Sequence, residues 1–532
     1  MTVVSFSFLV FFALLMLLYF VFPHKIQWFV LLIFSYVFYY SVSGRLPIYI
    51  FITTVITYLA ANFINKIKKD TDKKISENES ITKDEKKVLR SSSDKKRKAV
   101  LIIAICLNIG LLAIFKYVNP FLQAFSKFSA DFGVAVSATK INLILPLGIS
   151  FYTFQSIGYL VDVYRKKTAP EKNFFKTALF VSYFSQIIEG PIGRFDKLAP
   201  QLFAQHKFSF ERFKKSVFLV LWGFFKKLVI ADNLAPMITD VKLNYNAYDG
   251  FQVLLTMFLF GIQLYADFSG YMDIVTGFSS ILGIEIEKNF NRPYFSKTVT
   301  EFWRKWHISL CSWFRDYLFY PIFMSKKMMN LAKRLRTKGH KTAAKNIPTY
   351  IAMIVVWFLT GLWHAANWPQ VLWGLCNGLI MISALQFKPA YDKINKKLHI
   401  KTNSFPWTVF RIIRTYLLMT LLNFISEFAT LRDALNCIAR MFSGIIPSSV
   451  SVSYFFPKII DSGIFVVAFT LLACLLLFAH SLYEEKHGSV IKKVCSKNFV
   501  IQLTVFIVIL FYIVLFSDAS NNAAGGFMYA QF

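Results

Sequence analysis

Long apolar runs recur along the whole chain and limit what it can fold into. Each has roughly the 20 residues that an α-helix needs to cross the hydrocarbon core of a bilayer. The runs occupy residues 3–22, 27–43, 47–64, 99–118, 141–163, 174–190, 215–232, 251–284, 347–362, 366–386, 406–427, 462–480 and 499–517. Lipid cannot hydrogen-bond the backbone, so such segments must be helical. The sequence therefore predicts an all-α polytopic membrane protein with about a dozen spans.

Basic residues gather in a few of the loops that join these runs. The formal charge of +31 would suggest a nucleic-acid partner in a soluble protein, but Lys and Arg concentrate at 65–98, 326–346, 388–401 and 484–497. Cytoplasmic loops of membrane proteins carry such an excess. We therefore place these loops in the cytoplasm and both chain ends outside, and we expect a lipid bilayer and no nucleic acid as partner. No Lys or Arg precedes the first run, which argues against a cleaved signal peptide.

The longest basic loop divides the chain. Residues 65–98 mix lysines with acids and serines, a composition that cannot bury itself and that predicts a cytoplasmic, largely disordered insert. Transmembrane helices are expected at 1–64, before this loop, and a core region at 99–386 follows it. Further transmembrane helices are expected at 387–517, and residues 518–532 form an extracytoplasmic tail.

Glycine, proline and charged residues interrupt the core. Irregular backbone at membrane depth must be sheltered by protein or water, and several charges accompany the breaks: Asp162, Glu189, Arg194, Asp267, Asp273, Arg304, Arg315 and Asp316. Two interpretations stay open for each charge, an ion pair that holds re-entrant segments or the lining of a substrate tunnel. Residues 295–323 are expected to form re-entrant or interfacial helices, with Trp303, Trp306 and Trp313 in a belt at the headgroup level.

Two histidines in the core are candidates for chemistry. His307 lies in WRKWHISL (303–310), and His364 lies in GLWHAANW (361–368), where one apolar run meets the next. A neutral imidazole, with an ordinary pKa of about 6.5, suits the acceptance of a proton from a hydroxyl that attacks a thioester. Either residue can instead be an ordinary packed histidine, and for His307 the two interpretations are evenly balanced.

Other kinds of site have no support in the sequence. The six cysteines are scattered without CxxC spacing, so neither a disulfide framework nor a zinc site is indicated. No GxxxxGK[ST] phosphate loop and no GxGxxG motif occurs, which leaves nucleotide hydrolysis and dinucleotide chemistry without a motif. We expect no metal and no tightly bound cofactor.

Six motifs in fixed order resemble those of the membrane-bound O-acyltransferase family. They are LPLGISFYTFQ (145–155), GPIGR (190–194), YADFSGYMD (265–273), NFNRPY (289–294), WRKWHISL and GLWHAANW. The resemblance runs from about residue 140 to 380 and is greatest to the bacterial branch that O-acetylates peptidoglycan and exopolysaccharides such as alginate. The teichoic-acid D-alanylation protein is a near relative of that branch.

The resemblance implies a ring of tilted transmembrane and re-entrant helices around a central tunnel, open to the donor on the cytoplasmic side and to the acceptor outside. It also implies that His364 is the principal catalytic residue and His307 the second. The sequence departs from the family pattern at Ala365-Ala366, where Gly-Ala is common, at 320–323, where Pro-Leu-Gly-Gly is common, and at Asn377, where a further histidine is common. None of these departures removes a core catalytic group.

The end of the chain carries another implied role. FMYAQF (527–532) resembles the FxYxxF terminus of the bacterial branch, in which the tyrosine hydroxyl takes the acyl group and hands it on. The resemblance thus implies that Tyr529 is an acyl relay on the tether 521–526. From the residues alone, an ordinary interfacial aromatic tail is the favoured interpretation.

We therefore predict a multi-pass O-acyltransferase of a bacterial plasma or inner membrane. It would move an acetyl-like group from a cytoplasmic thioester, either acetyl-CoA or an acyl-carrier-protein thioester, across the membrane to a cell-surface or secreted polysaccharide. A secreted SGNH-like acyltransferase would be its partner. His364 would act as general base and His307 would position the donor. Further tunnel candidates are Arg304, Lys305, Trp306, Arg315, Asp316, Asn367, Asp267 and Asp273.

Two other classes of protein stay open. A transporter or flippase of an acyl or glycan intermediate would also have broken helices and intramembrane charges. It would be expected to show inverted repeats, which the sequence does not reveal. A receptor or scaffold for a polysaccharide synthase would leave both histidines replaceable.

Overall fold

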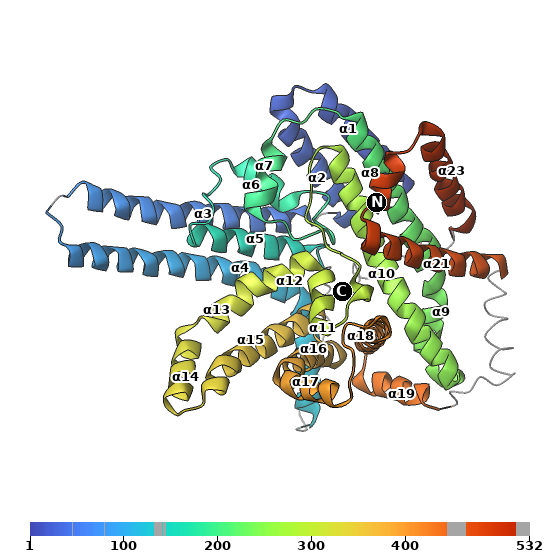
Figure 1. The fold of residues 1–532 in the computed structure, drawn as a ribbon. Coiled ribbons are helices and arrows are strands. Elements are labelled where there is room, and N and C mark those ends of the chain that lie inside the picture. Colours follow the sequence, from blue (N-terminus) through green and yellow to red (C-terminus); the bar gives the residue numbers. More distant parts are fainter. Residues whose placement is uncertain (45, 79, 132–140, 142–144, 444–463, 518–532) are drawn as a thin grey trace. The chain divides into compact units, whose positions relative to one another are not determined.

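The computed structural model describes the chain except for residues 45, 79, 132–140, 142–144, 444–463 and 518–532. Every regular element in the described part is a helix (Figure 1). The chain forms two compact units, one of residues 1–213 with 278–287 and one of residues 214–277 with 288–532. The predicted all-α class is confirmed.

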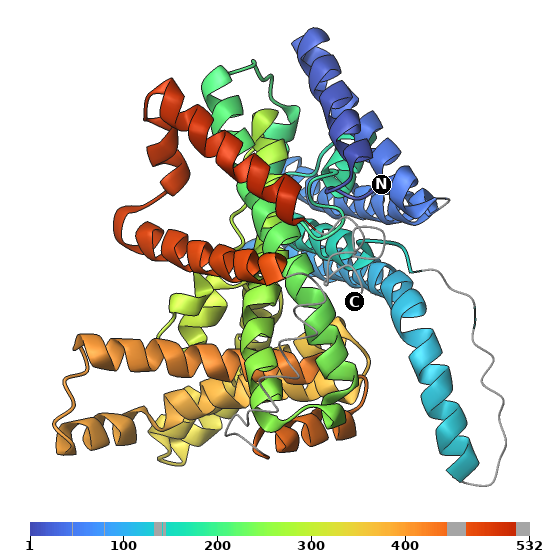
Figure 2. The ribbon, with the colours of Figure 1, turned by 90° about the vertical axis from the view of Figure 1, so that its right-hand side faces the viewer.

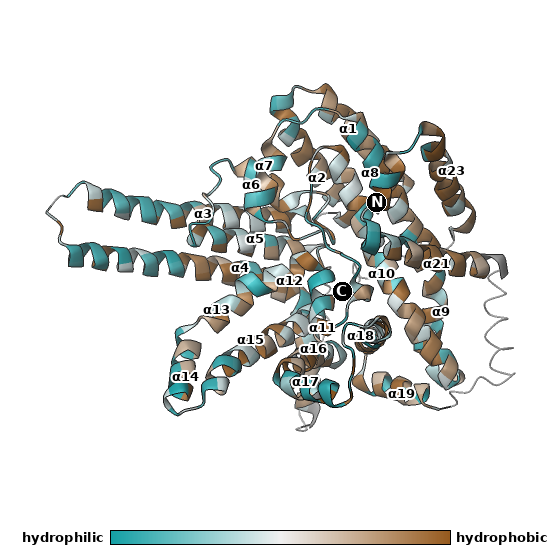
Figure 3. Cartoon of the chain, viewed as in Figure 1, coloured by the Kyte–Doolittle hydropathy of each residue, from teal (hydrophilic) through white to brown (hydrophobic). Residues whose placement is uncertain are grey.

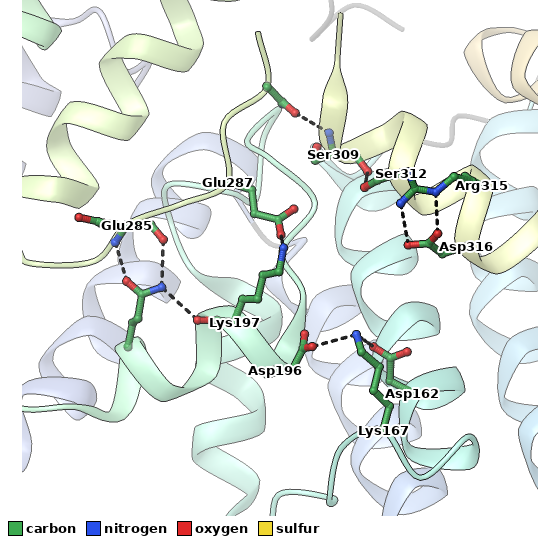
Figure 4. A network of polar contacts seen from close by, with 12 residues as sticks. Asp162, Lys167, Asp196, Lys197, Glu285, Glu287, Ser309, Ser312, Arg315 and Asp316 are labelled. Carbon is green, nitrogen blue, oxygen red and sulfur yellow. Dashed lines mark hydrogen bonds and ion pairs between the residues drawn. The ribbon is translucent and has the colours of Figure 1, made fainter. Parts of the chain in front are cut away.

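The first unit contains the N-terminal helices. Its elements are α1 (Phe6–Val21), η1 (His24–Ile26), α2 (Gln27–Ser43), α3 (Pro47–Ser76), α4 (Lys83–Asp131), α5 (Ile149–Tyr164), α6 (Phe174–Ser182) and α7 (Phe195–Phe203). Ion pairs hold its connecting segments: the Lys167 ammonium lies 3.4 Å from the Asp162 carboxylate and 2.8 Å from that of Asp196 (Figure 4). Asp162 thus fits the first of its two interpretations, a structural ion pair.

The second unit contains the remaining helices, and the boundary between the units crosses α8 and α10. Its elements are α8 (Phe210–Phe224), η2 (Phe225–Ala231), α9 (Asp232–Leu243), η3 (Tyr245–Ala247), α10 (Gly250–Ile281), η4 (Pro293–Phe295), α11 (Val299–Lys305), α12 (Ile308–Phe314), η5 (Arg315–Phe319), α13 (Tyr320–Phe323), α14 (Lys326–Thr337), α15 (Lys341–His364), α16 (Trp368–Gln386), α17 (Lys388–Lys397), α18 (Phe405–Ser426), α19 (Leu431–Met441), α21 (Ile464–His487), α22 (Val490–Cys495) and α23 (Phe499–Phe516). Two of them, η2 and η5, are π-helices, a form that is common at functional sites.

Nine helices in the described part are long and apolar enough to cross a membrane: His24–Ser43, Pro47–Ser76, Lys83–Ser126, Gly250–Ile281, Lys341–His364, Trp368–Gln386, Phe405–Ser426, Val467–His487 and Phe499–Phe516. The apolar helix Phe6–Val21 is shorter. Figure 2 shows the C-terminal part of α4, in cyan, as one long helix. Helix α4 contains Pro120 and ends at Asp131. The chain is therefore a multi-pass membrane protein.

Two of the predicted spans are not long helices. The run 174–190 contains only the nine residues of α6, after which buried, non-helical backbone extends to Gly193. A Cβ at Gly190 would lie 2.2 Å from the Ser185 carbonyl oxygen, so the chain turns there where a side chain cannot fit. In the run 141–163 the helix begins only at Ile149, because Gly148 has a left-handed φ of 71°. The apolar character of residues 177–190 and of α5 in the second run reflects burial inside the unit.

The prediction of disorder at residues 65–98 is wrong for most of the described residues of this loop, which belong to α3 and α4. The two transmembrane helices α3 and α4 continue into this region and lie side by side as a polar hairpin (Figures 1 and 3). A capping box starts α4: the Thr82 backbone N–H donates to the Glu85 carboxylate at 2.9 Å, and the Glu85 N–H donates to the Thr82 hydroxyl at 3.3 Å. Because both helices are already nucleated in the membrane, the lysine-rich residues only have to extend them.

Candidate active site

The α15–α16 hairpin places His364 at the end of a helix. Helix α15 ends at His364, since Ala365 is extended, and α16 starts after Asn367, whose side chain accepts a hydrogen bond from the Gln370 N–H at 3.0 Å. The two helices approach closely at glycines. A Cβ on Gly361 would lie 2.4 Å from the Gln370 carbonyl oxygen, and one on Gly374 would lie 2.3 Å from that of Trp357. Close packing therefore fixes the position of His364.

Aromatic rings surround the buried imidazole of His364. Its ring centroid lies 4.6 Å from that of Trp363 and 5.0 Å from that of Trp373, at interplanar angles of 65° and 82°. The Trp373 indole N–H donates to the Asn423 side-chain oxygen at 2.9 Å, which holds that ring in place. The packed surroundings therefore restrict the orientation of the His364 ring.

His307 lies in a tight turn between α11 and α12. Its backbone has a left-handed φ of 43°, a conformation that costs a residue with a side chain roughly 1–2 kcal/mol. The NFNRPY motif holds this turn. The backbone N–H of Ile308 donates to the Asn289 carbonyl at 3.0 Å, and that of Ser309 donates to the Asn289 side-chain oxygen at 3.0 Å. The neighbouring Asn291 N–H donates to the Lys305 carbonyl at 3.0 Å. These three hydrogen bonds hold the turn in its strained conformation.

The imidazole of His307 is almost completely buried, with 1% exposed, and its ring lies edge-on to Phe268 at 4.9 Å. Burial lowers the pKa of His307 to about 3, because the charged form loses its hydration. The side chain is therefore neutral at neutral pH. A neutral imidazole can position a polar group or accept a proton, but it does not supply a positive charge.

One aromatic cluster connects the surroundings of the two histidines. Trp303 on α11 packs against Trp357 and Trp373 at 4.9 and 5.7 Å, and its indole N–H donates to the Asn377 side-chain oxygen at 2.9 Å. Trp306 packs at 5.4 Å from Phe302, at 5.0 Å from Phe290 and at 6.0 Å from Tyr294.

The predicted headgroup belt is wrong for the three tryptophans. Trp303, Trp306 and Trp313 are 9%, 1% and 4% exposed, so they form the interior of the second unit. The expected short helices at 295–323 are present as η4, α11, α12, η5 and α13. Trp306 therefore packs inside the protein, directly before His307.

The predicted tunnel residues fall into separate local groups. Lys305 pairs with Glu301 at 2.9 Å within α11, next to the exposed Arg304, and the adjacent Arg315 and Asp316 pair at 2.8 Å (Figure 4). The side chain of Asn367 caps α16. Asp267 and Asp273 lie on α10 and form ion pairs with lysines. For most of these residues the structure gives a local structural partner, and it does not gather them around one point.

Sequence reasoning missed two buried lysines on the π-helix η2. Lys226 and Lys227 are 3% and 2% exposed. The Lys226 ammonium lies 2.8 Å from the Asp273 carboxylate, and that of Lys227 lies 2.6 Å from Asp267 and 2.9 Å from Asp232. The signal was present, because two adjacent lysines inside the apolar run 215–232 need carboxylate partners. The YADFSGYMD motif on α10 supplies two of these partners.

Tyr529 and its tether lie outside the described residues. The relay role of Tyr529 therefore stays a prediction. The two histidines, the α10 carboxylates and the turn-forming Asn289 all lie in the second unit.

Known proteins match the part of the chain that holds these residues. The model of the membrane-bound O-acyltransferase family matches residues 170–426. A "Probable alginate O-acetylase AlgI" of Azotobacter vinelandii is 35% identical over 52% of this chain and 52% of its own length. The "Peptidoglycan O-acetyltransferase" of Helicobacter pylori is 30% identical over 59% of each chain. The "Teichoic acid D-alanyltransferase" of Streptococcus thermophilus is 26% identical over 54% of this chain and 68% of its own length. The chain spans about half the length of the alginate relatives that it matches.

Proposed function

We propose that the protein is a membrane O-acyltransferase, because the model of the membrane-bound O-acyltransferase family matches its residues 170–426. It takes an acetyl-like group from a cytoplasmic thioester and delivers it across a bacterial plasma or inner membrane for O-acylation of a cell-surface or secreted polysaccharide. The names of the relatives support a polymer acceptor, since they include an alginate O-acetylase and a peptidoglycan O-acetyltransferase.

The observation that carries this proposal is the placement of His364. It is buried at the junction of two close-packed helices, inside the matched domain, and aromatic rings restrict its orientation. In the proposed reaction, a hydroxyl oxygen attacks the thioester carbonyl carbon while His364 accepts the hydroxyl proton. The carbon–sulfur bond then breaks, and the proton passes to the departing thiolate. General-base catalysis of this kind contributes about 10²–10⁴-fold in rate.

His307 has a different role in this proposal. Because its imidazole is neutral and packed against Phe268, it positions the donor or assists the proton transfer as a hydrogen-bonding group. Asn289 is the positioning residue for this turn, since both its carbonyl and its side chain bind the backbone that follows His307.

Labelled donor tests the proposed activity directly. The full chain, purified and reconstituted in lipid vesicles, is incubated with [¹⁴C]acetyl-CoA and with an acetylated carrier protein in parallel, and label on protein and on added polysaccharide is counted. We expect transfer from one of the two thioesters. If both thioesters remained intact while the protein was folded and inserted, the result would contradict acyl transfer. It would favour the alternative function, a transporter or flippase.

The acyl relay through Tyr529 has its own test. Here the phenol attacks the thioester, an acyl–oxygen ester forms on the tyrosine, and the thiol leaves. Mass spectrometry of the C-terminal peptide should show this ester in the wild type and its absence in Tyr529→Phe and His364→Ala. Full polysaccharide acylation by Tyr529→Phe would rule out the relay while leaving direct transfer intact.

A further inference from the structure

The polar part of α4 carries six cationic side chains along one face. At 3.6 residues per turn, the six positions fall within about one half of the helix circumference. Together with Ser91, Asp94 and Tyr164 they line a groove of 620 Å³ in the first unit, which we name the α4 groove. The six cations are Lys83, Lys86, Lys87, Arg90, Lys95 and Lys98.

A buried arginine contacts two of the residues that line the groove, Asp94 and Tyr164. Arg97 is 3% exposed, and its guanidinium donates at 2.6 Å to the carbonyl oxygen of Tyr164, the last residue of α5. It also lies 5.1 Å from the centroid of the Tyr164 ring and pairs with Asp94 at 2.8 Å. Arg97 therefore fixes α4 against the end of α5 and neutralises the groove's single carboxylate. Within the described residues, none of the six lining cations forms an ion pair.

This arrangement is unfavourable for the isolated helix. Like charges three or four residues apart, such as Lys83 with Lys87 and Lys86 with Arg90, each destabilise a helix by roughly 0.2–0.5 kcal/mol. A ligand with several negative charges would remove this repulsion. Arginine and lysine are the side chains that bind phosphate groups, and a groove of this volume is the size of a small-molecule site.

The length of the groove argues for a soluble ligand rather than for phospholipid headgroups. Lys83 and Lys98 are separated by 98 − 83 = 15 residues, which is about 22 Å along a helix. The apolar run of α4 begins at residue 99, so only Lys95 and Lys98 adjoin the membrane surface. Electrostatic attraction to the surface is screened over about 8–10 Å at physiological salt. Along the helix, Lys83, Lys86, Lys87 and Arg90 all lie farther than this from the apolar run, which favours a soluble ligand.

We propose that the α4 groove binds the polyphosphate part of a soluble nucleotide, namely the 3′-phosphorylated ADP group that coenzyme A thioesters carry. The phosphates bind Lys86, Lys87 and Arg90 in the middle of the groove. That this nucleotide belongs to the acyl donor rests on the proposed function; binding of the nucleotide itself does not.

The test compares two variants of the full chain with equal loss of charge. K86Q/K87Q/R90Q changes the groove, and K69Q/K74Q/K96Q changes exposed lysines of the same hairpin that do not line it. Binding of coenzyme A is measured by calorimetry on purified protein in neutral-lipid nanodiscs. We expect the groove variant to bind at least tenfold more weakly and the control variant to stay within about twofold of the wild type. Pantetheine, which lacks the phosphates, should not compete.

Three results would overturn the proposal. One is equal weakening in both variants, which would mean binding to overall charge. Another is absence of coenzyme A binding while phosphatidylglycerol nanodiscs bind through Lys86, Lys87 and Arg90. The third is acyl transfer by the groove variant with an unchanged donor KM. Groove-dependent binding of coenzyme A without any acyl transfer would instead contradict only the proposed function.

Discussion

The imidazole of His364 lies edge-on to the indole of Trp373, with ring centroids 5.0 Å apart and an interplanar angle of 82°. Trp373 is in turn held by Asn423 and packed against Trp303, whose indole N–H binds Asn377. Two asparagine–tryptophan hydrogen bonds therefore hold the Trp373 and Trp303 rings that pack beside the candidate base, His364. This gives a structural reason for Asn377, the residue at which the family pattern commonly has a histidine.

Replacing Asn377 should destabilise the packing of Trp303 and Trp373. In Asn377→Leu the buried Trp303 N–H loses its acceptor, which typically costs about 1–3 kcal/mol. We expect a lower thermal unfolding temperature in detergent and reduced acyl transfer. Asn395→Leu on α17, whose side chain is partly exposed, is the matched control and should change neither. An Asn377→Leu protein with wild-type stability would show that this hydrogen bond does not hold the cluster.

Gly361→Ala tests whether close helix packing positions His364. The new Cβ would lie 2.4 Å from the Gln370 carbonyl oxygen, so α15 and α16 must separate. Overpacking of this kind costs about 1–3 kcal/mol, and we expect transfer to fall with stability. Gly110→Ala on α4, where a Cβ meets nothing within 4 Å, is the control. Equal activity and unfolding temperature in the two variants would contradict a positioning role for this contact.

Removing Lys227 should destabilise the second unit strongly. Lys227→Met takes away a cation within 3 Å of both Asp267 and Asp232, and breaking a buried pair costs about 3–5 kcal/mol. The double variant Lys227→Met/Asp267→Asn should be more stable than the single one, because one of the two charges is also removed. Unfolding of the two variants, measured side by side, checks the order. The reverse order would mean that the carboxylates are satisfied without Lys227.

Burial of His307 predicts a pH dependence of stability. Its pKa is lowered to about 3 in the folded protein, against an ordinary value of about 6.5. Between these values the unfolded chain binds the proton and the folded chain does not, so stability is full above pH 6.5 and falls as the pH falls towards 3. From pH 6.5 to 5 the loss is about 2 kcal/mol.

His307→Asn removes this titration and keeps a side chain that tolerates left-handed backbone. We expect the unfolding temperature of the variant to fall less than that of the wild type between pH 7 and 5. The same drop in both proteins would mean that His307 is accessible to protons in the folded state.

The sequence was sufficient for the features that depend on composition. The apolar runs predicted the all-α membrane class, and the motif resemblance pointed to the family whose model matches residues 170–426. The sequence-based predictions were wrong where tertiary contacts determine the local structure. Residues 174–190 are apolar because they are buried, and neither the left-handed turn at His307 nor the burial of Trp306 follows from local sequence.

The helical hairpin at 65–98 is a different kind of failure. Its low hydrophobicity suggested disorder, yet Thr82 and Glu85 have the spacing of a capping box. That local signal was available and was outweighed by composition.

The central claim is that His364 accepts the proton in acyl transfer, and the release of free thiol from the donor thioester measures this step directly. The reaction is followed in vesicles at equal amounts of folded wild type, His364→Ala and the exposed control His340→Ala. We predict that His364→Ala slows thiol release by about 10²–10⁴-fold, while His340→Ala remains at the wild-type rate. Thiol release by His364→Ala at the wild-type rate would contradict the assignment of His364 as the catalytic base.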